Sequence, residues 1–561
     1  MGKKRRLILQ DYDLLDKTSL KDIKRTFATS GGTPFENQIR KKPSIRTNQI
    51  DPLMRIAEEC EADGYDQDTA VRVSEQYDPE EWGRLVTTIN EQKHVVRIRQ
   101  REQAFTIGRH RTANMTLNQA LVSNIHGKLY AIETDTHEKL VCYEDVSANG
   151  TLWNGETILK HRIVILSNMD SLQIGKQVFI YTHHSLAGEF PVGSQAPAMQ
   201  TTFPDFDIQG YTITCRSIGS GSYSIVRLAF DRRTALQVAC KVMRLDQIRG
   251  RKGLSQQISR EVALMTKLAH PNVVCFRCAA QDDQHIYIFA DLLTGGDLQN
   301  YIARKRYLSG AEAKFVTFQI LTGLDYLHNY VNVAHRDIKV SSIHDMTWID
   351  TTSGLQPENI ILRNFGPYPQ VLISDFGTAR SANNQRSASL VGTIYYWPPE
   401  CFTSTYDGKA LDCYSLGICL YAMLSGRLPY DVPHFGQGHD SARRSEGIVS
   451  PDASSGDLRA GAIFRSDINE DLSAMEKQLA KNILSGNMLF GRAFACVDKN
   501  AIDLIRNLAA SDSRARYNIQ EALRHVWITK SQTELKALYA KTVRVTPSEP
   551  ADAVPSENLN N

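Results

Sequence analysis

The pattern of hydrophobic and polar positions separates an unpatterned first segment from two patterned regions. Residues 1–80 are rich in charge and poor in aromatic side chains, and their apolar positions follow neither the strand period of 2 nor the helical period of 3.6 for long. Such a segment cannot bury enough apolar surface to offset the entropy lost on ordering. We therefore expect residues 1–80 to form a disordered or loosely helical, charged arm.

Short β-rich runs follow between residues 82 and 184, with turn residues between them. They occupy residues 95–98, 127–132, 139–143 and 177–181. Many short strands at this spacing predict an all-β sandwich. The next segment, residues 185–207, contains three prolines and is expected to be a domain linker.

The length of the chain indicates a second domain in addition to the predicted sandwich. At 561 residues the chain exceeds what one hydrophobic core usually supports, and 42% hydrophobic residues suffice for globular cores. We assign the second domain to residues 208–529 and a C-terminal tail to residues 530–561. Within that domain the polar stretch 436–471 is expected to be a surface loop.

Charge and hydropathy exclude several classes of partner. The net charge of +3 is small for this length, so we expect no direct nucleic-acid binding. No apolar run reaches about 18 residues, so we expect neither a membrane span nor a signal peptide, and hence an intracellular protein. Basic clusters at 3–6 and 40–42 favour nuclear import, with a cytoplasmic share, although a solvated terminus remains the alternative for the first cluster.

Three short motifs in the β-rich region have the chemistry of a phosphate site. They are Gly108-Arg109, the run Ser123-Asn124-Ile125-His126, and the run from Asp145 to Thr151. A phosphate is bound by a cationic fork and neutral donors on loops that a rigid scaffold holds. In this order and at these gaps the motifs resemble the forkhead-associated (FHA) domain, which recognises phosphothreonine peptides.

The FHA resemblance implies a role for each motif residue. Arg109 would supply the charge for the phosphate, and Ser123 would donate its hydroxyl to it. Asn124 would help to orient the peptide, and Asn149 would hydrogen-bond the peptide backbone. His126 is expected to fix the loop instead of contacting the ligand. The alternative is that Arg109 and Asn149 only stabilise turns.

An ordered set of motifs marks the second domain. It comprises a glycine-rich run at 218–226, Lys241 in Val-Ala-Cys-Lys, Glu261 before His270-Pro271-Asn272, the pair of segments His335–Lys339 and Pro357–Leu362, the triplet Asp375-Phe376-Gly377, Pro398-Pro399-Glu400, Asp412 and Arg516. This set resembles the eukaryotic protein serine/threonine kinases. The expected fold is therefore multidomain, an all-β FHA sandwich followed by an α+β bilobal kinase fold.

The kinase resemblance implies ATP and Mg²⁺ as cofactors and assigns residues to them. Asp337 would orient and deprotonate the substrate hydroxyl, and Lys339 would neutralise charge on the transferred phosphoryl group. Asn359 and Asp375 would hold the metal. The nucleotide would be bound by Ile218, Gly219, Ser220, Gly221, Val226, Lys241, Glu261, Asp291 and Leu293. Asp412 would brace the catalytic loop, and Arg516 would pair with Glu400.

Substrate choice and activation are also implied by the resemblance. Asp297 and Glu358 would engage a basic residue, so we expect sites preceded by arginine. Arg336 marks kinases whose activation segment is ordered by a phosphate. The candidates for that phosphate are Ser387, Ser389 and Thr393.

A seventeen-residue insert, residues 340–356, interrupts the catalytic loop. Removing it gives His-Arg-Asp-Ile-Lys-Pro-Glu-Asn. Val340-Ser341 can be encoded GTA-AGT and Gln356 CAG, which match a splice donor and acceptor, so we favour a retained intron. A genuine loop is the alternative, because lengthening a loop costs only about 0.6 kcal/mol per doubling. A true insert beside Asp337 would crowd the substrate groove.

The order of FHA domain and kinase resembles the DNA-damage checkpoint kinases and their meiotic relatives in fungi. The resemblance implies phosphothreonine-containing protein partners, protein substrates, and self-association that raises local concentration for activation in trans. Two functions stay open: an active kinase recruited by phosphothreonine, and a phosphopeptide-binding scaffold with an impaired kinase fold.

Overall fold

The structure is a computed structural model, and it describes four stretches of the chain. They are residues 81–183, with gaps at 90–91, 100–103, 135–138 and 159; residues 205–339, with gaps at 222–223 and 250–253; residues 359–430, with gaps at 382–393 and 404; and residues 474–543. The expected arm at 1–80, most of the linker, the insert at 340–356 and the loop at 436–471 lie outside these stretches.

The chain divides into two compact units. The first unit comprises Met1–Lys252, Arg277–Gly296 and Asn364–Gly366, and the second comprises Gly253–Phe276, Asp297–Arg363 and Pro367–Asn561. Among the described residues, no helix combines the length and apolar character that crossing a membrane requires.

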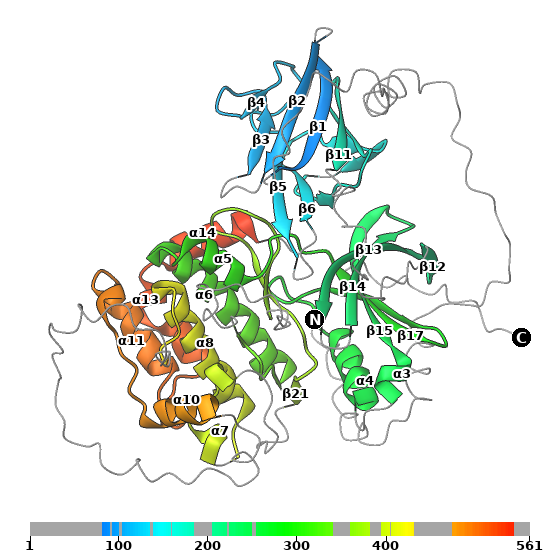
Figure 1. Ribbon diagram of the computed structural model, residues 1–561. Coiled ribbons are helices and arrows are strands. Elements are labelled where there is room, and N and C mark those ends of the chain that lie inside the picture. The colour runs from blue at the N-terminus through cyan, green and yellow to red at the C-terminus, as the bar shows by residue number, and fades with distance from the viewer. Residues whose placement is uncertain are drawn as a thin grey trace, which may run out of the picture. The chain divides into compact units, whose positions relative to one another are not determined.

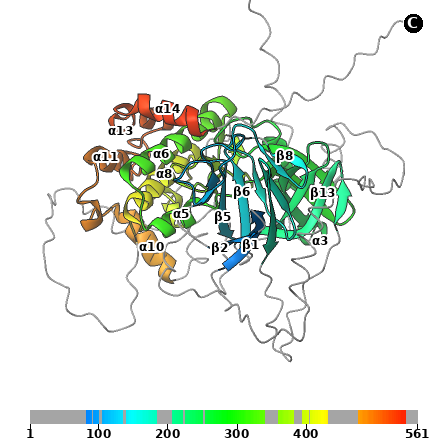
Figure 2. The same cartoon turned by 90° about the horizontal axis from the view of Figure 1, so that it is seen from above.

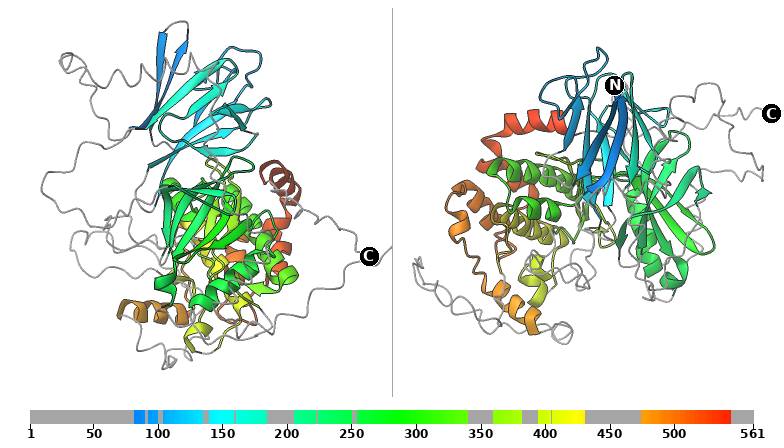
Figure 3. Two further views of the ribbon diagram at one scale, coloured as in Figure 1. Left: turned by 90° about the vertical axis from the view of Figure 1, so that its right-hand side faces the viewer. Right: turned by 45° about the horizontal axis from the view of Figure 1, so that its top comes forward.

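The first unit begins with a β-sandwich (Figures 1 and 3). One sheet has the order β2-β1-β11-β10-β7-β8 and the other β4-β3-β5-β6-β9. Their strands are β1 Glu81–Ile89, β2 Gln92–Arg99, β3 Phe105–Gly108, β4 Met115–Thr116, β5 Gly127–Glu133, β6 Lys139–Asp145, β7 Thr151–Trp153, β8 Glu156–Ile158, β9 Ile163–Ile165, β10 Ser171–Ile174 and β11 Gln177–His183. The four β-rich runs predicted from the sequence lie inside β2, β5, β6 and β11.

Side-chain alternation explains how the sandwich closes. On β5 and β6, Leu129 pairs with Tyr143 and Ala131 pairs with Val141. These four side chains are buried in one core with residues of the other sheet, including Phe179. Successive strand residues point to opposite faces, so the intervening positions face away from this core.

A third sheet of the first unit has the order β12-β13-β14-β15-β17-β16. Its strands are β12 Phe206–Ile208, β13 Tyr211–Gly221, β14 Ser224–Asp231, β15 Leu236–Arg244, β16 Phe276–Gln281 and β17 His285–Asp291, and the short helix α3 spans Leu245–Arg249. Phe206 and Asp207, placed in the linker by the sequence pattern, belong to the edge strand β12. One face of this sheet packs Val238, Cys240 and Phe289 into a core.

The second unit is mainly helical (Figures 1 and 2). Its helices are α4 Leu254–Met265, α5 Leu298–Lys305, α6 Gly310–Asp325 with the π-helix η2 Tyr326–Val331, η4 Ile394–Tyr396, α7 Glu400–Thr403, α8 Gly408–Ser425, α10 Ala474–Ser485, η5 Arg492–Phe494, α11 Lys499–Leu508, α12 Ile519–Arg524, α13 Val526–Thr529 and α14 Gln532–Thr542. Its strands are β18 Val333–Ala334, β19 Ile360–Leu362, β20 Val371–Ile373 and β21 Arg380–Ser381. Helix α8 contacts both α6 and α11.

Local sequence fixes the ends of the two central helices. Ser309 caps α6, and its side chain accepts from the Glu312 N–H; Asp407 caps α8 in the same way through the Lys409 N–H. Helix α8 ends at Gly426, whose φ of +70° puts it in the left-handed region. A Cβ there would lie 2.0 Å from the Arg306 carbonyl oxygen, so a side chain is excluded for space as well.

Candidate functional site

The first part of the site is the group of loops at one end of the sandwich. Arg109 follows β3, and its N–H donates to the Ser123 carbonyl at 2.8 Å; the His110 N–H donates to the Asn124 carbonyl at 3.1 Å. Gly108 allows this pairing, because a Cβ at that position would lie 2.2 Å from the Asn124 carbonyl oxygen. The β3–β4 loop and the β4–β5 loop are therefore held together through their backbones.

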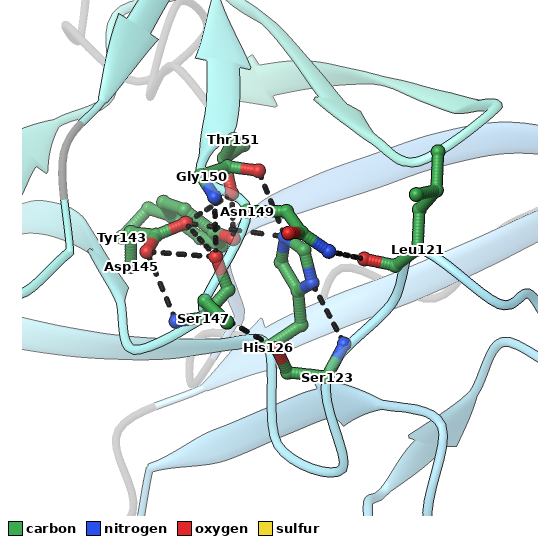
Figure 4. Close-up of polar contacts among 10 residues, drawn as sticks. Leu121, Ser123, His126, Tyr143, Asp145, Ser147, Asn149, Gly150 and Thr151 are labelled. Atoms are coloured by element: carbon green, nitrogen blue, oxygen red, sulfur yellow. Dashed lines mark hydrogen bonds and ion pairs between the residues drawn. The ribbon is translucent and has the colours of Figure 1, made fainter.

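The third loop is built around the buried carboxylate of Asp145, at the end of β6 (Figure 4). One carboxylate oxygen accepts from the Ser147 N–H at 3.0 Å, and the other accepts from the Thr151 hydroxyl at 2.6 Å. The Ser147 hydroxyl oxygen in turn accepts from the Gly150 N–H at 2.7 Å. Tyr143 adds a hydrogen bond to Thr151 at 2.7 Å. These contacts make the turn at 146–150 rigid.

His126 joins two of the loops, as the sequence analysis expected. Its Nδ1 accepts from the Ser123 N–H at 3.2 Å, so Nε2 carries the proton and donates to the Gly150 carbonyl at 3.1 Å (Figure 4). Burial lowers the pKa of His126, against the opposing effect of Asp145. The ring is therefore neutral at physiological pH and acts as a structural bridge.

The four predicted phosphopeptide residues lie on these joined loops. Arg109, Asn124 and Asn149 are exposed, and the Arg109 guanidinium forms no hydrogen bond within the described part of the chain. The Ser123 hydroxyl oxygen accepts from the Ala148 N–H at 3.0 Å, which leaves its proton for donation to a ligand. Asn149 donates its amide to the Leu121 carbonyl at 2.8 Å, which leaves the amide oxygen to accept from a peptide N–H (Figure 4). The roles themselves stay predictions.

No individual role was predicted for Asp145, Ser147 or Thr151, although the run that contains them is one of the three phosphate-site motifs. None of them can be assigned to a ligand, because their polar atoms are used within the loop. A signal was present: an aspartate two residues before a serine is typical of an Asx turn.

The predicted nucleotide residues of the first unit lie on a hairpin and its neighbours. Strands β13 and β14 pair Gly219 with Val226 and Gly221 with Ser224, so the glycine-rich run forms the end of a β-hairpin. Val226 pairs in turn with Lys241 on β15. Cross-strand partners share a face of the sheet, so Val226 and Lys241 lie on the face opposite to the core of Val238 and Cys240.

The end of β17 and the segment that follows it carry two further predicted nucleotide residues. Asp291 ends β17, and Arg277 holds its carboxylate through an ion pair of 2.8 Å. Leu293 follows and is partly buried. Ala290 pairs with Ala239, two residues before Lys241, so its small side chain lies on the same face as Lys241. Glu261 lies on α4 of the second unit and is 7% exposed, and its pairing with Lys241 stays a prediction.

The catalytic segment of the second unit is braced by Asp412, as predicted. This carboxylate on α8 is fully buried and accepts from the N–H groups of His335 at 2.8 Å and Arg336 at 2.7 Å. His328 adds a third hydrogen bond at 2.8 Å. Arg336 has a φ of +69°, a strained conformation for a side chain of this size, and the three contacts hold the segment in it.

Asp337 and Asn359 lie together although residues 340–356 separate them in the sequence. The Asn359 amide donates to one carboxylate oxygen of Asp337 at 2.7 Å and to the Asp337 carbonyl at 2.7 Å. Lys339 is 3% exposed, and its ammonium lies 3.5 Å from the same carboxylate. The two flanks of the insert therefore present the three predicted catalytic and metal residues as one group.

Asp375 is held beside this group by its neighbours. The Ser374 N–H donates to the Asn359 carbonyl at 2.9 Å, and the Ser374 carbonyl accepts from His335 at 2.9 Å. Phe376 is buried against the His335 ring, with 5.2 Å between centroids. Asp375 itself is exposed and has a φ of +58°. Its side chain therefore projects from a fixed backbone.

These residues fit a divalent metal bound to nucleotide phosphates. Because the Asn359 amide nitrogen donates to Asp337, its amide oxygen would remain for a metal ion, and Asp375 would add a carboxylate. Oxygen donors of this kind are what Mg²⁺ prefers. When bound, the metal would neutralise charge on the phosphate oxygens of ATP.

The predicted ion pair of Arg516 and Glu400 is present. The guanidinium donates from Nη1 and Nη2 to the two carboxylate oxygens at 2.6 and 2.9 Å. Arg516 also donates to the carbonyls of Ala510 and Ala410 and lies over the Tyr414 ring. This pair therefore joins α7, α8 and the segment before α12.

The predicted specificity and activation residues are only partly described. Asp297 caps α5, where its carboxylate accepts from the N–H and the side-chain amide of Asn300, each at 2.7 Å. Burial raises its pKa, against the effect of these hydrogen bonds and of Arg304. The remaining candidates, Glu358, Ser387, Ser389 and Thr393, lie outside the described residues.

Known proteins agree with both parts of this site. A family model described as "Protein kinase domain" matches residues 213–528, more than half of the chain, and one described as "FHA domain" matches residues 105–175. The meiosis-specific serine/threonine-protein kinase mek1 of Schizosaccharomyces pombe is 27% identical over 457 residues, which cover 77% of this chain and 83% of that protein.

Two further serine/threonine-protein kinases are similar to this chain over most of their own length. The probable serine/threonine-protein kinase fhkA of Dictyostelium discoideum is 26% identical, over 76% of this chain and 72% of its own length. The serine/threonine-protein kinase cds1 of Schizosaccharomyces pombe is 29% identical, over 58% of this chain and 68% of its own length. The predicted fold, an FHA sandwich followed by a kinase, is confirmed, and the chain belongs to the protein kinase family as a serine/threonine-protein kinase that carries an FHA domain.

Proposed function

We propose that this chain uses ATP and Mg²⁺ to phosphorylate serine or threonine residues of proteins to which its FHA domain recruits it through phosphothreonine. The setting is DNA-damage or meiotic checkpoint signalling in the nucleus. One relative is a kinase named as meiosis-specific, which supports this setting. The basic clusters at 3–6 and 40–42 support the nuclear location.

The observation that carries the proposal is the contact of Asn359 with Asp337 across the insert. Phosphoryl transfer depends mainly on position and electrostatics, and misplacement by ~1 Å can cost on the order of 100-fold in rate. The 2.7 Å hydrogen bond between these side chains supports a competent arrangement. Asp337 would accept the proton of the substrate hydroxyl, and Lys339 would stabilise charge on the phosphoryl group.

A second function, a phosphopeptide-binding scaffold, is favoured by one specific observation. Seventeen residues, 340–356, follow Lys339 directly, where the protein substrate would approach. If these residues are part of the mature protein, they would crowd that approach and slow transfer. The FHA loops would still bind phosphothreonine, because they belong to the other unit.

The test compares the chain as printed with a form that lacks residues 340–356. Transfer from Mg²⁺-ATP to a serine peptide is measured for both forms, with Asp337→Asn as the background of each. We expect the shorter form to exceed its Asp337→Asn background by at least about 100-fold, because that change removes the base that accepts the hydroxyl proton. If both forms transfer phosphate no faster than their Asp337→Asn variants but still bind a phosphothreonine peptide, the scaffold function is favoured. Sequencing of the transcript then decides which form exists, by the presence of 51 nucleotides.

The predicted preference for an arginine upstream of the target residue depends on Asp297. The variant Asp297→Asn tests it. Asp297→Asn keeps a residue that caps helices well but removes the charge. We expect it to raise KM for peptides with an upstream arginine and to leave KM for peptides with alanine there unchanged. A peptide array of the unaltered kinase that prefers acidic or proline-directed sites would contradict the assignment.

A further inference from the structure

The loop that follows α4, residues 266–275, is tied to the large helical unit by its backbone. The Val274 N–H donates to the Ile373 carbonyl at 3.0 Å, and the Ile373 N–H donates to the Asn272 carbonyl at 2.9 Å. Gln370 adds a hydrogen bond from its side chain to the Pro271 carbonyl at 2.8 Å. The loop is therefore fastened to β20 and the residue before it.

Asn272 is the buried centre of this attachment. Its side chain is fully buried, and its amide nitrogen donates to the Gln319 side chain on α6 at 3.2 Å and to the Val371 carbonyl at 2.8 Å. Gln319 is fully buried too and accepts from the Val371 N–H at 3.0 Å. Both amide protons of Asn272 are used, so its carbonyl oxygen needs a donor from elsewhere.

That donor comes from α14, beyond the residues that match the kinase family. The Tyr539 hydroxyl donates to the Asn272 amide oxygen at 2.5 Å. Burial raises the pKa of Tyr539 to about 12, so the hydroxyl keeps its proton at neutral pH. The family match ends at residue 528, whereas α14 spans Gln532–Thr542.

Helix α14 is docked firmly enough to supply this contact. The Tyr539 ring meets Phe318 of α6 edge to face, with 5.7 Å between centroids. Leu535 is buried one turn earlier, and Lys314 of α6 donates to the Ser531 hydroxyl at 3.1 Å. Figure 2 shows α14 beside α6.

The loop in turn continues from α4, which carries residues of the catalytic machinery. Gln257 of α4 donates its amide to the carbonyl of Gly377 at 2.8 Å, two residues after the metal-ligand candidate Asp375. Glu261, the predicted partner of the nucleotide lysine, lies one turn further along α4. A loop that holds the end of α4 therefore also limits how far Gln257 and Glu261 can shift.

We propose that Tyr539 is a positioning residue for phosphoryl transfer, acting through Asn272 to hold the loop 266–275 and helix α4 in the active arrangement. The inference rests on the proposed kinase activity for its catalytic consequence but not for its structural one. Helix α14 is then a part of the catalytic domain by function. Loss of the hydroxyl leaves the Asn272 oxygen without this donor, which raises the open fraction of the loop by about tenfold.

The experiment uses the full chain with Tyr539→Phe and, as a matched control, Ser531→Ala. The control removes the hydrogen bond from Lys314 to the same helix but leaves Asn272 untouched. Hydrogen exchange is followed at the amides of residues 268–275 and, for comparison, of α11. Steady-state kinetics give kcat, KM for ATP and KM for peptide. Tyr539→Ala, which also loses the Phe318 contact, serves as a graded second variant.

We expect Tyr539→Phe to speed exchange in residues 268–275 by about tenfold, with α11 unchanged, and Tyr539→Ala to speed it further. We expect kcat to fall about three- to tenfold while KM for peptide stays within about twofold, because α4 carries none of the residues predicted to engage the peptide. Ser531→Ala should do neither. Unchanged exchange in the loop, or equal acceleration in the loop and α11, would overturn the inference. Faster exchange in a protein with no transfer activity would instead contradict the proposed kinase activity.

Discussion

At the scale of single residues, the FHA loops contain two groups of side chains: those that hold the loops together and those that are predicted to face a ligand. Asp145, Ser147 and Thr151 use their polar atoms on one another and are buried. Arg109 and Ser123 instead keep donors that the loops' own hydrogen bonds do not use. If these loops bind a phosphate, their backbones would need little reorganisation, because hydrogen bonds already join them.

The first prediction concerns Arg109. Arg109→Ala should weaken binding of a phosphothreonine peptide by about 10- to 100-fold, because a hydrogen bond to a charged group contributes about 1.5–3 kcal/mol. Calorimetric titration with phosphorylated and unphosphorylated forms of one peptide measures the loss. Arg97→Ala is the matched control, since Arg97 is an exposed arginine on β2 of the same domain. Equal affinity of Arg109→Ala and the unaltered chain would refute the assignment.

At the scale of elements, buried polar side chains join segments that are distant in the sequence. Arg516 joins α7 and α8 to the segment before α12 by the ion pair with Glu400 and by two carbonyl contacts. Asp412 holds the catalytic segment from α8. Breaking one partner of such a buried pair costs more than replacing both, because a lone buried charge is left.

This asymmetry gives the second prediction. Arg516→Met should destabilise the helical unit by about 3–5 kcal/mol, and adding Glu400→Met should restore part of that loss, because the carboxylate that lost its guanidinium partner is then removed as well. The unfolding temperatures of the two variants and of the unaltered chain give the order of their stabilities. If the double variant unfolds at a lower temperature than Arg516→Met, the stabilising effect of the two residues does not come from their ion pair.

The third prediction concerns His270, in the loop that follows α4. Burial lowers its pKa from 6.5 to about 4, against the effect of Asp325, and the ring stacks on Tyr326. Between these two pH values the unfolded chain binds a proton that the folded chain does not. Stability therefore falls as the pH drops from about 6.5 towards 4.

The matched variant is His270→Asn, which keeps an acceptor for the Asn272 N–H but cannot titrate. From pH 7 to pH 5 the unaltered chain should lose about 1 kcal/mol more than the variant, a value reduced for the partial exposure of the ring. Thermal unfolding at both pH values measures this. Parallel losses in the two proteins would show that His270 is not the group responsible.

The sequence predicted elements and chemistry where short motifs determine both. The β-rich runs coincide with strands, and the predicted roles of Asp412, Arg516 and His126 as structural supports are confirmed. The contact between Tyr539 and Asn272 was not predicted, although Asn272 belongs to a recognised motif, because a tyrosine in a short helix has no distinctive spacing and the two positions are 267 residues apart. Long-range pairs of this kind depend on how helices pack, which local pattern does not determine.

At the scale of the whole molecule, we propose that a phosphate reader and a kinase in one chain would allow the protein to act on copies of itself. If the FHA domain of one molecule binds a phosphothreonine of another, the two catalytic domains are held at a high effective concentration. Phosphorylation of Ser387, Ser389 or Thr393 would then occur in trans. The first phosphothreonine would speed the later ones.

The fourth prediction follows from this arrangement. With Mg²⁺-ATP, the initial rate of autophosphorylation per molecule should rise with protein concentration, and the time course should show a lag that pre-phosphorylated protein removes. Arg109→Ala should lengthen the lag and flatten the dependence on concentration, because the second molecule is no longer retained, while Arg97→Ala should behave as the unaltered chain. Mass spectrometry should place the early phosphates in residues 382–393. A rate per molecule that is independent of concentration would mean that phosphorylation occurs within one molecule, and the reader would then serve only to recruit other proteins.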